Sequence, residues 1–199
     1  MTNAVNQAQF WEQRYQEGSD RWDLGQAAPV WRSLLNRADA PPPGRIAVLG
    51  CGRGHDARLF AEQGFEVVGF DFAPSAIAAA QERAQGTTAQ FLQRDIFALP
   101  QEFAGQFDYV LEHTCFCAID PDRRAEYVEV VRQILKPKGC LLGLFWCHDR
   151  PSGPPYGCSL TELRDRFAQG WQEEQLESVT ESVEGRRGEE YLGRWRRLN

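Results

Sequence analysis

A short apolar run at residues 45–49 leads directly into the turn Gly50-Cys51-Gly52-Arg53-Gly54, and this order constrains the fold most. The run has the length and composition of a buried strand, and residues 56–63 after the turn have those of a helix. Glycines in such a turn let the backbone approach a ligand without a clash from Cβ. Open α/β sheets bind ligands at the carboxyl ends of their strands, where this turn is expected. Alone, the turn is also compatible with tight packing and no ligand.

An acidic residue after the next predicted strand strengthens the case for a nucleotide. Asp71 follows the apolar run 66–70 and comes seventeen residues after Gly54. A carboxylate there can accept both hydrogen bonds of a ribose diol, although it could also cap the helix predicted from Pro74. Dinucleotide enzymes and methyltransferases share this arrangement. The turn lacks the later third glycine of dinucleotide-binding proteins, which disfavours NAD.

Asp95 and Ile96 follow the strand predicted around Phe91. Such a pair suits the edge and face of an adenine ring, but an Asp in a loop can equally be a turn cap. Further helices are predicted at 7–17, 29–37, 74–84, 121–135 and 159–167, and further strands at 107–111, 140–146, 172–183 and 189–198. Their alternation is typical of a doubly wound parallel sheet. The last two strands, separated by a turn at 185–188, predict an antiparallel hairpin.

Composition narrows the classes of partner. The 199 residues carry a net charge of −6 without a basic stripe before the last dozen residues, which disfavours nucleic acid and anionic membranes. We expect a cytoplasmic protein without a secretory signal or transmembrane segment. The six cysteines predict reduced core thiols and no metal site. We expect one domain over residues 1–199, a monomer that acts on a small molecule or anion.

Aromatic and histidine residues supply further candidates. Trp11 and Tyr15 lie near one face of the predicted helix 7–17, and Trp22 follows it. They could be core packing, or aromatic faces that cover a bound ligand. His113, just past the strand at 107–111, could contact a substrate, act as a base for a thiol, or be a hydrogen-bonded structural residue.

Other polar residues are given structural roles. His55 and Asp56 are expected to cap the helix after the glycine turn. Five arginines of the C-terminal hairpin are expected on a solvated face, namely Arg186, Arg187, Arg194, Arg196 and Arg197. A turn is expected at residues 136–139.

Several rare segments in one order resemble a known family. They are Trp11-Glu12, Trp22-Asp23-Leu24-Gly25, the glycine turn with His55-Asp56, Phe116-Cys117-Ala118-Ile119-Asp120-Pro121, Gly153-Pro154-Pro155-Tyr156 and the last eight residues. The chain resembles class I S-adenosylmethionine-dependent methyltransferases, more narrowly the thiopurine methyltransferase superfamily, and within it the thiol/halide methyltransferases. The resemblance implies a Rossmann-like α/β fold with a seven-stranded, mostly parallel sheet, an antiparallel last strand and helices on both faces. Residues 1–44 would then form a helical lid segment and residues 45–199 the core.

The resemblance also implies a cofactor and its contacts. S-adenosyl-L-methionine would bind, leaving S-adenosyl-L-homocysteine as product, with contacts at Trp11, Tyr15, Trp22, Gly50, Gly52, Asp71, Asp95 and Ile96. Tyr15 stands where plant members often have Trp. His113, the catalytic candidate, stands where the plant halide enzymes have Tyr and the thiopurine enzymes Arg. The acceptor therefore stays open between small soft nucleophiles (halide, bisulfide, thiocyanate, small thiols) and aromatic heterocyclic thiols. A non-catalytic nucleotide-binding domain is the alternative from another class.

Overall fold

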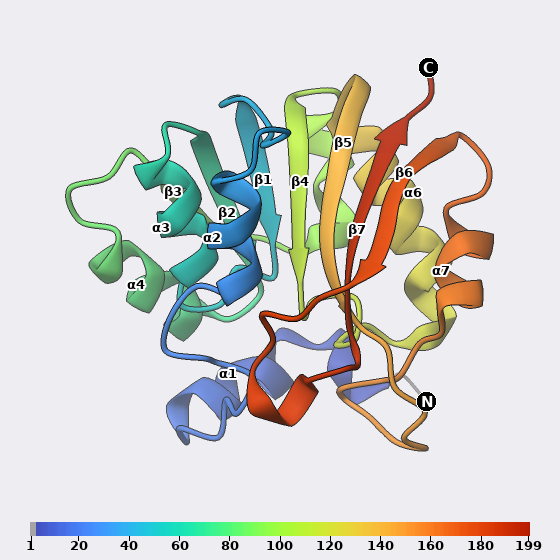
Figure 1. The fold of residues 1–199 in the computed structure, drawn as a ribbon. Helices are drawn as coiled ribbons and strands as arrows, with labels where there is room; N and C mark the ends of the chain where they lie inside the picture. Colours follow the sequence, from blue (N-terminus) through green and yellow to red (C-terminus); the bar gives the residue numbers. More distant parts are fainter. Residues whose placement is uncertain (1–2) are drawn as a thin grey trace.

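A seven-stranded sheet forms the centre of the computed structural model, which describes residues 3–199 (Figure 1). The first two residues of the predicted lid segment lie outside the described residues. The strands are β1 (Arg45–Leu49), β2 (Glu66–Asp71), β3 (Gln90–Gln93), β4 (Phe107–His113), β5 (Leu135–Trp146), β6 (Trp171–Ser178) and β7 (Glu190–Arg197). Their order is β3-β2-β1-β4-β5-β7-β6. Strands β1 to β5 pair in parallel, and β7 runs antiparallel to β5 and β6, which confirms the predicted reversed last strand.

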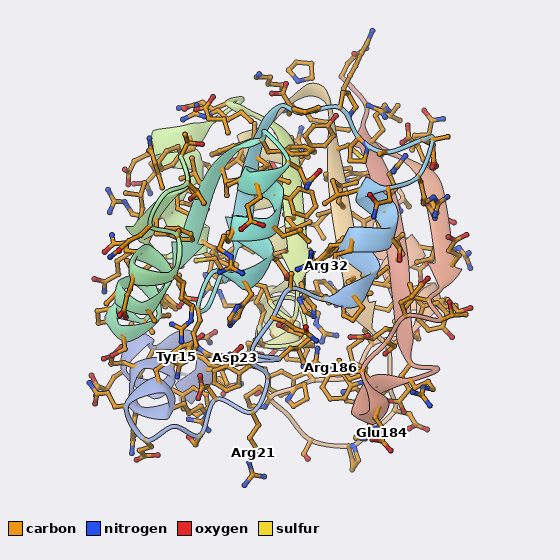
Figure 2. All side chains as sticks on the ribbon, turned by 60° about the vertical axis from the view of Figure 1, so that its left-hand side comes forward. Tyr15, Arg21, Asp23, Arg32, Glu184 and Arg186 are labelled. Carbon is orange, nitrogen blue, oxygen red and sulfur yellow. The ribbon has the colours of Figure 1, made fainter. Side chains whose placement is uncertain are left out.

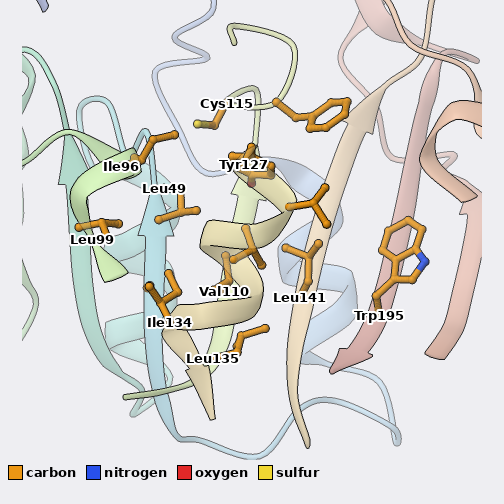
Figure 3. Packing of buried hydrophobic residues seen from close by; sticks show 14 of the residues in the cluster. Leu49, Ile96, Leu99, Val110, Cys115, Tyr127, Ile134, Leu135, Leu141 and Trp195 are labelled. Atoms are coloured by element: carbon orange, nitrogen blue, oxygen red, sulfur yellow. The ribbon is translucent and has the colours of Figure 1, made fainter. Parts of the chain in front are cut away.

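Helices cover both faces of the sheet. They are α1 (Ala8–Gln16), α2 (Pro29–Leu35), α3 (His55–Glu62), α4 (Pro74–Arg83), α5 (Pro100–Phe103), α6 (Arg124–Ile134) and α7 (Leu160–Arg166). Side chains alternate along a strand, so Ile46 and Val48 of β1 pack with α2, α3 and α4, while Ala47 and Leu49 point to the other face. On that second face, Leu49 belongs to a cluster that includes side chains of α5, α6 and α7. Figure 3 shows Leu49 in this cluster together with Tyr127 and Ile134 of α6. Each such side chain contributes roughly 1.5–3 kcal/mol by leaving water.

The connections that follow the parallel strands lie at the carboxyl edge of the sheet, which is its lower edge in Figure 1. The helix α1 lies below this edge, and so does the connection between β6 and β7 with its 3-10 helix η4 (Glu184–Arg186). Three further 3-10 helices are η1 (Ala4–Asn6), η2 (Ile96–Ala98) and η3 (Pro121–Arg123). No helix within residues 3–199 is long and apolar enough to cross a membrane.

Two sequence-based predictions of turns are wrong. Residues 136–139, predicted as a turn, belong to β5, because a shift in the ladder between Phe107 and Tyr109 accommodates them and Lys138 adopts a φ of 65°. The tight hairpin turn predicted at 185–188 is part of a longer connection over residues 179–189. This connection leaves the sheet to cover its carboxyl edge, which a two-residue turn could not do.

Candidate active site

A cavity of about 420 Å³ lies at this carboxyl edge. Its lining includes six of the predicted site residues, Trp11, Tyr15, Trp22, Gly50, Asp71 and Ile96. A smaller neighbouring cavity of about 50 Å³ is lined by Gly52 and His113, and it shares Tyr15, Trp22 and Gly50 with the large one. Figure 2 shows Tyr15, Asp23 and Arg186 in one band at this edge of the molecule. The structure therefore brings the N-terminal segment and the ends of β1, β2 and β4 together at one site.

The glycine turn after β1 has a backbone that requires glycine. Gly50 and Gly52 have φ values of 58° and 52°, in the left-handed region that side chains disfavour. A Cβ on Gly50 would also stand 3.1 Å from the thiol sulfur of Cys115, and a Cβ on Gly52 would stand 3.2 Å from the Tyr15 hydroxyl. The turn thus places bare backbone at the cavity wall, as the sequence predicted.

Asp71 ties the glycine turn to the end of β2. One carboxylate oxygen accepts a hydrogen bond from the Gly52 N–H and the other from the Ala73 N–H, both at 2.9 Å. Burial raises the pKa of the Asp71 carboxyl above its ordinary range, against these two hydrogen bonds. An ionised carboxylate has about four acceptor positions, so these two bonds leave acceptor capacity for a ligand. Supporting the turn and binding a diol are therefore compatible.

Three aromatic rings of the N-terminal segment pack edge to face beside the turn. The ring of Trp22 lies 5.5 Å from that of Trp11 and 5.6 Å from that of Tyr15, centroid to centroid. The Trp22 indole N–H donates to the Tyr15 hydroxyl at 3.3 Å, and the Trp11 indole N–H donates to the Val5 carbonyl at 2.8 Å. The three side chains are half-buried and line the cavity, so the aromatic stripe is not simply core.

The N-terminal segment is fastened to the core by polar contacts that sequence reasoning missed. The buried Glu12 carboxylate accepts from the Ser75 hydroxyl at 2.6 Å and from the Ser75 N–H at 3.0 Å, at the start of α4. The Arg53 guanidinium of the glycine turn pairs with Asp20 at 2.7 Å and with Asp23 at 3.0 Å. The adjacent Trp11-Glu12 and Trp22-Asp23 pairs in the sequence were the available signal, since each places a carboxylate beside a lining aromatic.

His55 and Asp56 do not cap the helix, so that prediction is wrong. The N-cap of α3 is Gly54, without a side-chain hydrogen bond. The Asp56 carboxylate accepts from the Ala28 N–H at 2.8 Å and lies 2.7 Å from His113 Nδ1. His55 Nε2 lies 3.1 Å from an oxygen of Asp23. The folded-back N-terminal segment supplies a partner to each of them, Asp23 to His55 and Ala28 to Asp56, and β4 supplies His113 to Asp56.

Arg186 is also placed differently from the prediction. Only 5% of its surface is exposed, and it lines the large cavity instead of a solvated hairpin face. Its guanidinium donates to the Trp22 carbonyl at 3.3 Å and lies 3.3 Å from His113 Nε2. It also lies 3.4 Å from Glu190 and 4.8 Å from the centre of the Trp146 ring. The prediction assumed strand alternation through this segment, but Arg186 lies in the connection that crosses the sheet edge.

Asp95 stands beside the cavity. Its carboxylate accepts from the Phe97 N–H at 2.9 Å and so caps η2. The neighbouring side chains of Arg94, Ile96 and Phe97 line the cavity instead. The structure thus places a cap at Asp95, and an adenine contact through its side chain stays a prediction.

The lining also holds the charged side chains of Arg14, Arg21 and Arg94, and several uncharged groups. Thr114, with a φ of 62°, and the buried thiols of Cys115 and Cys117 line the large cavity. All six cysteines are free. No group of three or more His, Cys, Asp or Glu within residues 3–199 is arranged to hold a metal ion.

Comparison with known proteins identifies the family. Residues 6–194 match the family model "Thiopurine S-methyltransferase (TPMT)". Thiocyanate methyltransferase 1 of Brassica oleracea is 33% identical over 197 residues, which cover 95% of this chain and 85% of that protein. These matches confirm the resemblance inferred from the sequence.

Solved structures support the fold. A structure from work on the conversion of a disulfide bond into a thioacetal group during echinomycin biosynthesis superimposes with a TM-score of 0.80 at 24% identity, covering 96% of this chain and 92% of that one. The Burkholderia thailandensis 1,6-didemethyltoxoflavin-N1-methyltransferase, solved with S-adenosylhomocysteine, gives a TM-score of 0.77 at 21% identity, covering 96% and 87%. The chain belongs to the thiopurine S-methyltransferase family and is an S-adenosylmethionine-dependent methyltransferase.

Proposed function

We propose that this protein transfers the methyl group of S-adenosylmethionine to a small soft anion, namely a halide, bisulfide, thiocyanate or a small thiolate. The observation that carries the proposal is the buried Arg186 guanidinium in the wall of a largely apolar cavity. Of the lining side chains within residues 3–199, Asp71 alone carries a carboxylate. The similarity to a thiocyanate methyltransferase supports the same class of acceptor.

The cavity has two ends, which follow from strand order. The cofactor end lies over β1 and β2 and comprises Gly50, Gly52, Asp71 and Ile96. The acceptor end lies over β4, β5 and β7 and comprises Trp146, Val183 and Arg186.

The residues at the cofactor end fit S-adenosylmethionine. Asp71 would accept from the ribose hydroxyls with its free lone pairs, the bare backbone of Gly50 and Gly52 would allow close approach, and Ile96 would cover the adenine. When bound, the cofactor would supply a methyl group on a sulfonium sulfur, and the acceptor would bond to the methyl carbon as the carbon–sulfur bond breaks and S-adenosylhomocysteine leaves. The faces of Trp11 and Trp22 suit that positive charge by cation–π attraction.

The N-terminal segment would act as a lid over the cofactor end. Its aromatic side chains line the cavity, and contacts through Glu12 and Arg53 hold it against α4 and the glycine turn. A closed lid excludes water, which otherwise solvates and weakens the nucleophile. We include the described part of the segment, residues 3–44, in the same functional unit as the core.

The acceptor end would hold an anion without supplying a base. A halide or thiocyanate has no proton to lose, and a thiol with a pKa of about 8.5 is partly ionised near neutral pH. The Arg186 guanidinium would stabilise the anion, and the Trp146 ring beside it would keep the site dry. Alignment and desolvation of this kind can supply most of the rate of a methyl transfer.

Methylation of aromatic heterocyclic thiols is the second candidate. Trp146, Pro154 and Pro155 give the cavity flat apolar surfaces on which a heterocycle could stack. The family match supports this candidate. The two candidates share the cofactor and differ only in the size of the acceptor.

A panel of acceptors tests the proposal. The purified protein is incubated with S-adenosylmethionine and iodide, bisulfide, thiocyanate or 6-thiopurine, with volatile products measured by headspace gas chromatography and methylated thiopurine by liquid chromatography. We expect methyl iodide and methanethiol at higher kcat/KM than the methylated thiopurine. Turnover of the thiopurine alone would replace the first candidate by the second. No product from any acceptor would contradict both.

A further inference from the structure

His113 is bonded at both ring nitrogens to charged groups. Nδ1 lies 2.7 Å from Oδ2 of Asp56, and Nε2 lies 3.3 Å from Nη1 of Arg186. The side chains of His113 and Asp56 are 11% and 13% exposed. The carboxylate, imidazole and guanidinium therefore form one chain that ends at the wall of the cavity.

One protonation state satisfies both contacts. A guanidinium has only N–H donors, so Nε2 must offer its lone pair, and a carboxylate only accepts, so Nδ1 must carry the hydrogen. This series of hydrogen bonds from Asp56 through His113 to Arg186 thus requires the neutral imidazole tautomer protonated on Nδ1. Accepting a proton from a thiol would place an N–H on Nε2, directly against the N–H of Arg186. A role as base would break the contact that the structure shows.

Asp56 is built to hold the ring in this tautomer. It lies in the first turn of α3 and also accepts from the Ala28 N–H at 2.8 Å. The two hydrogen bonds that it accepts, from the Ala28 N–H and from His113 Nδ1–H, favour the ionised form of this carboxylate. An ionised carboxylate at Nδ1 fixes the lone pair at Nε2, as it does wherever a carboxylate orients a histidine.

Arg186 depends on several weak contacts for its position. Its nitrogens lie 3.3 Å from the Trp22 carbonyl, 3.3 Å from His113 and 3.4 Å from Glu190. All three exceed the usual range of about 2.7–3.2 Å, so none of them alone fixes the guanidinium. Loss of the imidazole contact should let the guanidinium move within the cavity wall.

We propose that His113 is a positioning residue that fixes Arg186 at the acceptor end and does not act as a base. The inference rests on the proposed function, since it assumes that Arg186 faces the acceptor. The same chain also reaches the N-terminal segment at both Trp22 and Ala28, so it aligns the acceptor end with the lid. The charged groups around His113 are Asp56 from α3, Glu112 from β4, Arg186 from η4 and, behind Arg186, Glu190 from β7.

Kinetics of two variants separate positioning from base catalysis. In His113→Gln the amide oxygen can accept from Arg186 and the amide N–H can donate to Asp56, whereas His113→Ala removes both contacts. We expect His113→Ala to raise the KM for iodide and for bisulfide by the same factor, about tenfold for one lost hydrogen bond to a charged group. We expect His113→Gln to restore most of the loss and the Kd of S-adenosylhomocysteine to change less than twofold. A loss confined to bisulfide, with iodide turnover intact, would overturn the proposal.

Nitrogen NMR of the imidazole rings gives a readout independent of turnover. The chain has three histidines, so the signals of His113 can be assigned with the His113→Gln variant. We expect a neutral ring with its hydrogen on Nδ1 at neutral pH, and a shift of the Nε2 signal in Arg186→Met but not in Arg187→Met, whose side chain is exposed. A hydrogen on Nε2 would overturn the proposal. A wild-type protein that methylates nothing would refute the proposed function, while the NMR result would still decide the role of His113.

Discussion

At the cofactor end the glycine turn and Asp71 come from neighbouring segments of the sequence, whereas at the acceptor end Arg186 takes its contacts from segments farther apart. At the cofactor end, the Gly52 N–H of the glycine turn bonds to Asp71 within one strand–helix–strand unit. At the acceptor end, Arg186 meets Trp146 and His113, which lie forty and seventy-three residues away. The cofactor end is fixed mainly by backbone hydrogen bonds and the acceptor end by side-chain contacts. We therefore expect a substitution at the acceptor end to alter acceptor binding and to leave cofactor binding unchanged.

The largest expected effect is at the cofactor end. Asp71→Ala removes the acceptors of the ribose diol and of the Gly52 N–H, so we expect S-adenosylhomocysteine to bind more weakly by roughly 1–3 kcal/mol. Isothermal titration calorimetry measures the change. Asp95→Ala is the matched variant, since Asp95 caps η2 beside the cavity, and we expect a smaller loss. Unchanged affinity in Asp71→Ala would mean that Asp71 serves only the turn, and equal losses would support the adenine role of Asp95.

The second largest expected effect is at the acceptor end. Arg186→Met keeps most of the side-chain volume but removes the charge. We therefore expect kcat/KM for bisulfide and iodide to fall by a factor that corresponds to about 2 kcal/mol of lost transition-state stabilisation. Arg187→Met is the control, because Arg187 is the exposed neighbour in the same connection. Equal activity of the two variants in steady-state assays would remove Arg186 from the acceptor end.

The residues of the cofactor end could be predicted from the sequence more completely than those of the acceptor end. The glycine turn and Asp71 could be predicted because a strand, a turn and a strand end in register define them locally. Arg186 could not, because strand alternation says nothing about a connection that leaves the sheet. For Asp56, local capping rules favoured a role that the distant Ala28 and His113 override in the structure. Helices and strands were predicted nearly throughout, since their periodicity is local, while the bulge in β5 depends on its partner strand.

Acidic pH should weaken the cofactor end selectively. Burial raises the pKa of Asp71 above its ordinary value of 3.8, and only the ionised carboxylate has all its lone pairs for the diol. As the pH falls through this raised pKa, the affinity for S-adenosylhomocysteine should fall, by at most about tenfold per pH unit. Calorimetry at stepwise lower pH, starting from pH 7, should show this slope in the wild type and not in Asp71→Asn. The same slope in the variant would assign it to another group.

The smallest expected effect concerns the aromatic lid. Tyr15→Phe removes the hydroxyl that accepts from the Trp22 indole, and we expect S-adenosylhomocysteine to bind more weakly by about 0.5–1 kcal/mol. Calorimetry and a thermal melt check the result. A loss greater than about tenfold would show that the hydroxyl contacts the cofactor directly and would extend the cofactor end to α1.

The most direct test measures cofactor binding and acceptor binding in one variant of each end of the cavity. The Kd of S-adenosylhomocysteine and the KM of bisulfide, at saturating S-adenosylmethionine, are measured for the wild type, Asp71→Ala and Arg186→Met. We expect Asp71→Ala to raise only the Kd and Arg186→Met to raise only the KM. Both variants raising both constants together would contradict a cavity with separate cofactor and acceptor ends.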